Sequence, residues 1–132
     1  MRRVLLALAW MLLVSSACGD ADRGLPREYR AVAVPVQQLA SSDAVTRGRA
    51  LFQKYCTLCH GVRGDGKGLQ HEGLTPPPRD FTDPAWRQRT SPRHVYFAIR
   101  EGVATTAMPS WKSLTEQDGW DLTAYVLSLS RN

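Results

Sequence analysis

The sequence Cys56-Thr57-Leu58-Cys59-His60 places two thiols three positions apart and follows them at once with an imidazole. This Cys-x-x-Cys-His spacing is typical of covalent c-type haem attachment. Each thiol adds to one vinyl group of the porphyrin, so the two must lie about one helical turn apart. The imidazole of His60 can then ligate the iron from one side. The motif therefore predicts one covalent haem c, held by Cys56, Cys59 and His60.

Two other interpretations of paired cysteines fit this chain less well. A thioredoxin-like redox pair needs a strand and helix around it, and no such pattern precedes Cys56. A structural zinc site needs two further ligands at a comparable spacing. Outside the motif the only remaining cysteine or histidine residues are Cys18, His71 and His94.

Residues 1–17 predict an export signal peptide. Arg2 and Arg3 form a short positive region, and an uncharged apolar run of 11 residues, Val4–Val14, follows it. That run is shorter than the about 20 residues that an ordinary membrane-spanning helix needs. Export agrees with the haem motif, because bacteria attach c-type haem outside the cytoplasm.

The segment that ends at Cys18 (LVSSAC) resembles a bacterial lipoprotein cleavage site, at which the cysteine is acylated and becomes the new N-terminus. Ser15 stands where an aliphatic residue is usual, and ordinary cleavage near Ala17 is the alternative. We expect lipidation at Cys18, because an odd free thiol in an exported protein needs an explanation. Two or three acyl chains anchor a protein stably. The predicted location is the periplasmic side of the membrane.

Residues 18–43 predict a lipid-anchored tether, since they hold Gly24, Pro26 and Pro35 and only one short apolar stretch, Ala31–Val36. A flexible segment of this length spans on the order of 25–30 Å. Part of it can instead dock on the domain or on a partner.

The charge of the chain does not predict nucleic-acid binding. The formal charge of +5 includes Arg2 and Arg3, and their removal leaves 15 basic and 12 acidic residues, a net charge of +3. No stripe of alternating aromatic and basic residues is present. A mildly basic face towards an acidic partner remains possible.

Residues 44–132 predict one small all-α domain with three main helices and long loops wrapped around one covalent haem. The first helix, 44–58, has its apolar residues on one face at spacings of 3 and 4 and ends in the haem motif. The second, 92–101, has Ser91 as N-cap, Pro92 at its first position and Gly102 after its end. The third, 116–129, begins after a capping residue, Thr115.

Residues 61–90 contain five glycines and four prolines and predict a long loop. A loop of this length inside a small domain usually has a function, and enclosing a planar cofactor is such a function. Glycines permit close backbone approach and positive φ angles beside the porphyrin. A glycine-rich phosphate loop is the competing interpretation, but no Gly-Lys-Ser/Thr ending follows.

Met108 is the predicted sixth ligand. It is the only methionine left once Met1 and Met11 leave with the signal peptide, and it lies in a loop before Pro109. A thioether is a suitable soft ligand for haem iron, although a lone methionine more often fills a gap in a core. His71 and His94 are the rival ligands.

These features together resemble a class I monohaem cytochrome c, close to the bacterial group related to the cytochromes of cbb3-type oxidases. The resemblance covers residues 45–130 and rests on the haem motif, the glycine loop, Pro76–Pro78, Met108-Pro109 and the last helix. It implies that the first helix crosses the last one where Gly48 approaches Tyr125. It also implies that the carbonyl of Pro77 or Pro78 orients His60. Trp86 and Trp111 are candidate propionate partners or plain packing residues.

We expect an electron-transfer protein and not an enzyme. It would carry single electrons between redox partner proteins of a membrane respiratory chain, anchored through its lipid. The alternative is a fixed haem subunit of a larger membrane complex, such as a quinol-oxidising complex or a terminal oxidase. A haem sensor or peroxidase with an open iron site would require that Met108 does not ligate.

Overall fold

The computed structural model of the protein describes residues 22–131. The predicted signal peptide, 1–17, and Cys18 lie outside the described residues. All regular elements in the described part are helical, which confirms the all-α fold class. They are α1 (Arg27–Arg30), α2 (Val36–Leu39), α3 (Ser42–Tyr55), α4 (Thr57–His60), α5 (Pro84–Arg89), α6 (Pro92–Glu101), α7 (Glu116–Ser128) and the 3₁₀ turn η1 (Leu129–Arg131).

The ends of the long helices follow local capping signals. The Ser91 hydroxyl accepts a hydrogen bond from the His94 amide (3.2 Å), and Thr115 forms a capping box with Asp118 at the start of α7. Such caps satisfy amide groups that have no partner inside the helix. The bounds of α6 match the prediction, and α7 ends one residue earlier than predicted.

The predicted first helix, 44–58, is wrong in one respect, because the structure divides it into α3 and α4 at Cys56. Cys56 has φ −116° and ψ −24°, and it is both the C-cap residue of α3 and the N-cap residue of α4. The short helix α5, which lies inside the predicted loop 61–90, was not predicted.

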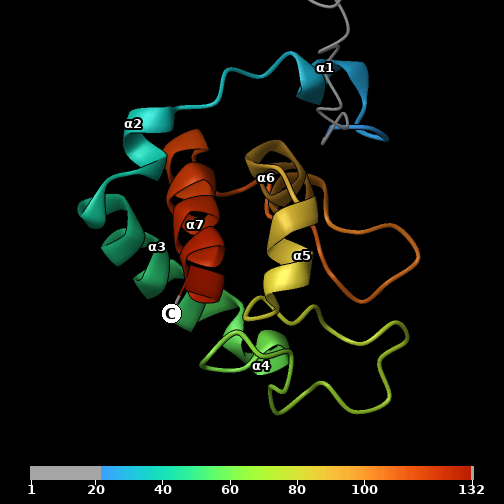
Figure 1. Ribbon diagram of the computed structural model, residues 1–132. Helices are drawn as coiled ribbons and strands as arrows, with labels where there is room; N and C mark the ends of the chain where they lie inside the picture. Colours follow the sequence, from blue (N-terminus) through green and yellow to red (C-terminus); the bar gives the residue numbers. More distant parts are fainter. Residues whose placement is uncertain (1–21, 132) are drawn as a thin grey trace, which may run out of the picture.

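The core is formed where α3 crosses α7 and α6 packs beside α7 (Figure 1). The α3–α7 crossing is close because Gly48 has no side chain: a Cβ there would lie 2.0 Å from the Asp121 carbonyl oxygen and 2.9 Å from the Tyr125 Cβ. This confirms the expectation from the resemblance that the first helix crosses the last one where Gly48 approaches Tyr125. The buried core side chains are Phe52, Val95, Ile99, Leu122, Tyr125, Val126 and Leu127.

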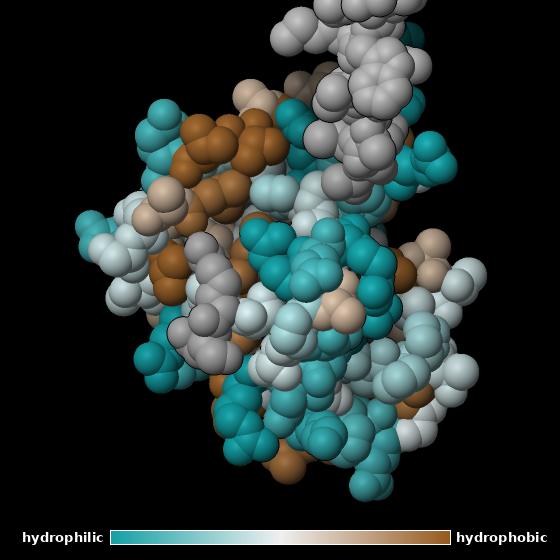
Figure 2. Space-filling view, viewed as in Figure 1, coloured by the Kyte–Doolittle hydropathy of each residue, from teal (hydrophilic) through white to brown (hydrophobic). Residues whose placement is uncertain are grey.

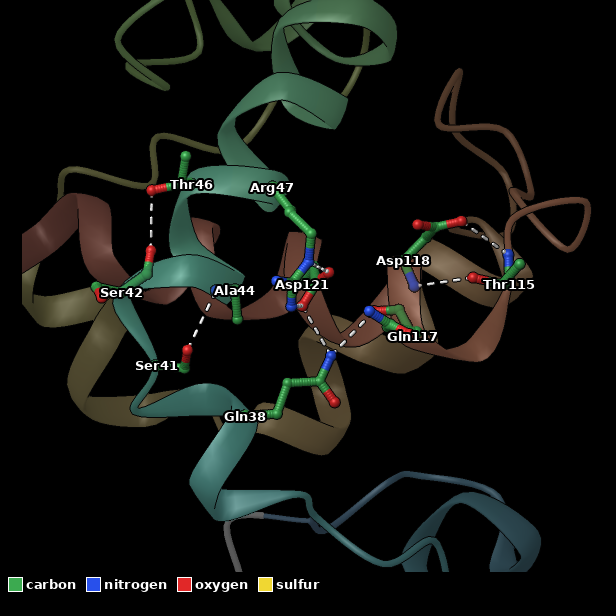
Figure 3. Close-up of polar contacts among 10 residues, drawn as sticks. All are labelled: Gln38, Ser41, Ser42, Ala44, Thr46, Arg47, Thr115, Gln117, Asp118 and Asp121. Carbon is green, nitrogen blue, oxygen red and sulfur yellow. Dashed lines mark hydrogen bonds and ion pairs between the residues drawn. The ribbon is translucent and has the colours of Figure 1, made fainter.

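A buried carboxylate fixes the same crossing (Figure 3). Asp121 is 1% exposed and accepts two hydrogen bonds from the guanidinium of Arg47, from Nε at 2.7 Å and from Nη2 at 3.0 Å. The amide of Gln38 donates a third bond, 2.8 Å long. With these partners the buried charge is paired and hydrogen-bonded, which its burial requires.

Residues 22–41, called the N-terminal strap below, lie against α6 and α7. At its start Asp22 bonds the Ser91 hydroxyl and pairs with Arg93, whose Nη1 is 2.8 Å from Asp22 Oδ2. In its middle the Tyr29 hydroxyl donates a hydrogen bond to Glu101, and near its end the Gln38 side-chain amide donates one to Asp121. Figure 2 shows an apolar area over α2, where Val36 is 60% exposed. Within the described residues, no helix has the length and apolar character needed to cross a membrane.

Candidate haem-binding site

The two motif cysteines lie at the end of α3 and in the short helix that follows it. Cys56 follows α3, which α7 holds in place, and Cys59 lies one turn later in α4. Both thiols are free and partly buried. Burial, and secondarily the nearby Cys59, raises the pKa of Cys56 to about 12. A protonated, uncharged thiol suits this partly buried position.

His60 is buried and held in one orientation. Its Nδ1 lies 3.1 Å from the carbonyl oxygen of Arg79, and its ring stacks on Phe81 with centroids 4.5 Å apart and 21° between planes. A carbonyl can only accept a hydrogen bond, so Nδ1 carries the proton and Nε2 keeps its lone pair. Burial lowers the pKa of His60, although the Arg79 bond acts in the opposite direction. The imidazole is therefore neutral and able to ligate iron.

The orienting carbonyl differs from the predicted one. The resemblance implied Pro77 or Pro78, whereas the structure places the Arg79 carbonyl at His60. The three consecutive prolines Pro76–Pro78 directly precede this residue. Phe81, which stacks on His60, was missed altogether. It is the only aromatic residue between the motif and Trp86, but a single contact from a loop leaves no periodic pattern.

The glycine loop, residues 61–70, closes over the backbone of the motif. The amides of Gly66, Gly68 and Gln70 donate to the carbonyls of His60 (2.9 Å), Cys59 (3.0 Å) and Leu58 (2.7 Å), which are the free carbonyls at the end of α4. A Cβ on Gly68 would lie 2.3 Å from the Leu58 oxygen and 2.4 Å from the Thr57 oxygen. The close approach expected of these glycines is thus made to the motif itself.

Met108 lies on a separate loop, residues 102–111, between α6 and α7. The loop turns back on itself through hydrogen bonds from the Val103 amide to the Met108 carbonyl (3.2 Å) and from the Met108 amide to the Thr106 hydroxyl (3.1 Å). Thr105 has φ +62°, which is rare for a β-branched residue. Figure 1 shows this loop and loop 61–83 projecting from the same side of the helices.

The rival ligands have local partners. Nδ1 of His71 lies 2.6 Å from the Gly68 carbonyl, and Nδ1 of His94 lies 3.2 Å from the Ser91 hydroxyl. Trp86 packs against Phe81, with ring centroids 5.2 Å apart, and Trp111 packs against Tyr55, 5.1 Å apart. Among residues 22–131 no group of three or more His, Cys, Asp or Glu side chains is placed to hold a metal ion, so the zinc interpretation finds no ligand set there.

The residues of α4 fit a covalent haem. Two free thiols lie about one turn apart, and the adjacent imidazole has its second nitrogen already committed to a carbonyl, as a histidine that ligates a metal requires. An aromatic series, Tyr125, Phe52 and Phe81, joins the α7 core to His60 with centroid distances of 5.2 Å between Tyr125 and Phe52 and 6.2 Å between Phe52 and Phe81. The imidazole is thus supported by packing as well as by its hydrogen bond.

The chain is similar to known cytochromes of the c type. The family model described as cytochrome c oxidase, cbb3-type, subunit III matches residues 43–126. A cytochrome c-553-like protein of Synechocystis sp. is 32% identical over 94 residues, which cover 70% of this chain and 76% of the relative.

Two solved structures share the fold. A chain of the reducing HAO-like protein complex of Kuenenia stuttgartiensis is 31% identical with a TM-score of 0.58, and the match covers 67% of this chain but only 44% of that one. The KustC0563 c-type cytochrome is 28% identical with a TM-score of 0.51, and the match covers 62% of this chain and 95% of that one. The chain belongs to the cbb3-type cytochrome c family and is a monohaem c-type cytochrome, an electron carrier that binds haem c covalently.

Proposed function

We propose that the protein is an exported, lipid-anchored cytochrome that carries single electrons between respiratory-chain partners. Cys56 and Cys59 form the thioether bonds, and His60 and Met108 are the axial ligands. The observation that supports this proposal best is the neutral His60 beside the two thiols, with its Nδ1 committed to the Arg79 carbonyl. When bound, the haem supplies the one-electron ferric/ferrous couple of its iron.

The chain's own residues restrain the His60 ring and shield it from solvent. His60 is 9% exposed, and Phe52, which is 1% exposed, and Phe81 surround its ring. The glycine loop fixes the backbone of α4. The bond to the Arg79 carbonyl and the stack on Phe81 restrain the imidazole ring itself. An electron carrier needs a site that rearranges little when the charge on the iron changes. With both axial positions of the iron filled, no position would be open for a substrate.

The axial ligands can be tested by spectroscopy of purified holoprotein. Met108→Ala should abolish the sulfur-to-iron charge-transfer band of the ferric protein, while covalent haem attachment through Cys56 and Cys59 stays intact. Met108→His is the matched control, because it keeps two axial ligands and should lower the reduction potential relative to a His/Met pair. An unchanged band in Met108→Ala would rule out Met108 as the ligand.

Covalent attachment is tested separately. Cys56→Ala and Cys59→Ala should each leave one thioether bond, and the double variant should lose haem on denaturation in acid organic solvent. A normal yield of covalent holoprotein from the double variant would overturn the assignment of these residues.

The anchor proposal sets a short distance between membrane and domain. Only three residues separate Cys18 from Asp22, which is tied to α6. Four extended residue steps reach at most about 14 Å, less than the 25–30 Å expected of a free tether over residues 18–43. Cys18→Ser should release the protein from membranes and abolish labelling by a radioactive fatty acid. Continued retention after a salt wash would contradict lipidation.

A second candidate function is a fixed subunit of a larger respiratory complex. Two observations favour it: the matching family is described as an oxidase subunit, and one structural neighbour is part of a protein complex. Purification of the native protein from gently solubilised membranes separates the two candidates. A stable stoichiometric complex would favour the subunit, and an isolated monohaem protein would favour the carrier.

A further inference from the structure

The Met108 loop is held at its base by a single carboxylate that also reaches the N-terminal strap. Glu101 is the last residue of α6, so the loop departs directly after it. One carboxylate oxygen lies 2.5 Å from the ammonium of Lys112, which follows the loop. The other accepts a hydrogen bond of 2.5 Å from the hydroxyl of Tyr29 in the strap. Glu101 thus joins the end of α6 to Lys112 beyond the loop and to the strap, where Tyr29 lies 72 positions away in sequence.

Two further hydrogen bonds complete this base. The Trp111 amide donates to the Ile99 carbonyl (3.0 Å), and the Ser110 hydroxyl donates to the Arg100 carbonyl (2.7 Å). All of these bonds pair the last turn of α6 with the residues just after Met108. Any change that lets Glu101 move therefore acts on the segment that carries the proposed sixth ligand.

Tyr29 is well placed to restrain Glu101. Its ring packs edge-on against Phe97, with centroids 4.7 Å apart, and at 6.3 Å from Tyr96. Burial, followed by the bond to Glu101, raises the pKa of Tyr29 to about 12, so the hydroxyl remains a donor at neutral pH. A hydrogen bond to a charged acceptor is about twice as strong as one between neutral groups.

The strap is attached at a few points and not along its whole length. Hollows remain beside it: one between Tyr29 and Glu101 on one side and Glu116 on the other, and one between Pro35 and Trp120. Its other polar attachments are at Asp22, at the Val32 carbonyl, which accepts a hydrogen bond of 2.9 Å from Arg93, and at Gln38. They reach the start of α6 and α7, not the base of the loop. The family match begins at residue 43, so the strap lies outside the matched residues.

We propose that Tyr29 is a positioning residue for the Met108 loop, through which docking of the strap stabilises ligation at the sixth position. The inference rests on the proposed ligation by Met108. It gives the strap a role beyond a tether: a strap drawn away from α6 removes one donor from Glu101 and loosens the base of the loop.

The test is binding of imidazole to the ferric holoprotein, because imidazole can reach the iron only when the Met108 loop opens. Tyr29→Phe keeps the ring packing and removes the hydroxyl, and it should raise the apparent affinity for imidazole by about tenfold, the effect expected of one lost bond to a charged group. Gln38→Ala is the matched control. It removes the attachment of the same strap to α7 and leaves the Tyr29–Glu101 bond in place, so it should change imidazole binding much less than Tyr29→Phe does.

A second readout needs no ligand. Hydrogen exchange at the Trp111 amide should be faster in Tyr29→Phe than in the wild-type holoprotein, and Gln38→Ala should affect it much less. Glu101→Gln should reproduce both effects, and adding Tyr29→Phe to it should change little.

The possible outcomes separate this inference from the proposed function. Unchanged imidazole binding and exchange in Tyr29→Phe, with the charge-transfer band lost in Met108→Ala, would overturn the inference and leave Met108 as ligand. Equal effects of Tyr29→Phe and Gln38→Ala would also overturn it, since general loosening would then explain both. Absence of the band from the wild type would refute the ligation and the inference together.

Discussion

Gly48→Ala tests whether the α3–α7 crossing sets the position of the haem motif. The added Cβ would lie 2.0 Å from the Asp121 carbonyl oxygen, where ordinary van der Waals contact begins at 3.4 Å. The two helices must therefore separate by about 1.4 Å at this point. The obstacle is backbone inside a helix, which cannot move aside as the end of a side chain can.

Two opposing effects decide whether Gly48→Ala stabilises or destabilises the protein. Alanine is favoured over glycine in a helix by about 1 kcal/mol. Overpacking costs about 1–3 kcal/mol, and a rigid obstacle places this case at the upper end. Gaps of 0.5–1 Å already remove a quarter to a half of a dispersion contact, so Phe52 and Tyr125 lose attraction as the helices part. We expect a net loss of about 2 kcal/mol in the free energy of unfolding.

The measurement is urea unfolding of the holoprotein, followed by far-ultraviolet circular dichroism. Ala50→Gly is the matched control: Ala50 is exposed in the same helix, so the change reports helix propensity alone and should cost about 1 kcal/mol. A Gly48→Ala variant as stable as the wild type, or more stable, would mean that propensity outweighs the contact and would refute the reasoning.

Three further predictions concern other polar or strained positions. Asp121→Asn should cost about 1–3 kcal/mol in urea unfolding, because it removes the charge that Arg47 and Gln38 contact in a buried place; a cost below about 0.5 kcal/mol would contradict the role given to the pair. Thr105→Asn should stabilise the protein by up to about 1 kcal/mol, because asparagine tolerates positive φ better than a β-branched residue; a loss of stability would show that the Thr105 side chain has another role. Lys112, followed by Tyr29, holds the pKa of Glu101 below its ordinary value of 4.5, so the stability difference between wild type and Glu101→Gln should be complete above about pH 4.5 and disappear as the pH falls below it; a difference that persists in acid would exclude ionised Glu101 as its source.

The parts of the fold that follow from short local signals were predictable. The bounds of α6 could be predicted because Ser91, Pro92 and Gly102 each act within one turn of the helix. The same holds for the start of α7 at its Thr115 cap. The haem motif is also local, since five adjacent residues contain both thiols and the imidazole.

Features that depend on contacts between distant segments could not be predicted. The break at Cys56 leaves an apolar face that continues at helical spacing, so periodicity alone joins α3 to α4. The Arg79 carbonyl carries no side-chain signal, because every residue has such a carbonyl. The contact of Tyr29 with Glu101 spans 72 positions, and neither residue has a neighbouring pattern that marks it as a partner.

The position of His60 depends on the backbone of its neighbours as much as on the motif. Gly48 lets α3 approach α7, and Gly68 lets the loop reach the carbonyls at the end of α4. A Cβ at Gly68 would meet two backbone oxygens at 2.3 and 2.4 Å, so neither could yield without breaking the bonds that the loop amides donate. A chain that kept the two thiols and the imidazole but replaced either glycine would still carry the chemical groups for haem attachment. It would lack the fixed imidazole that an electron carrier requires, because the two helices and the loop could no longer approach closely enough to hold it.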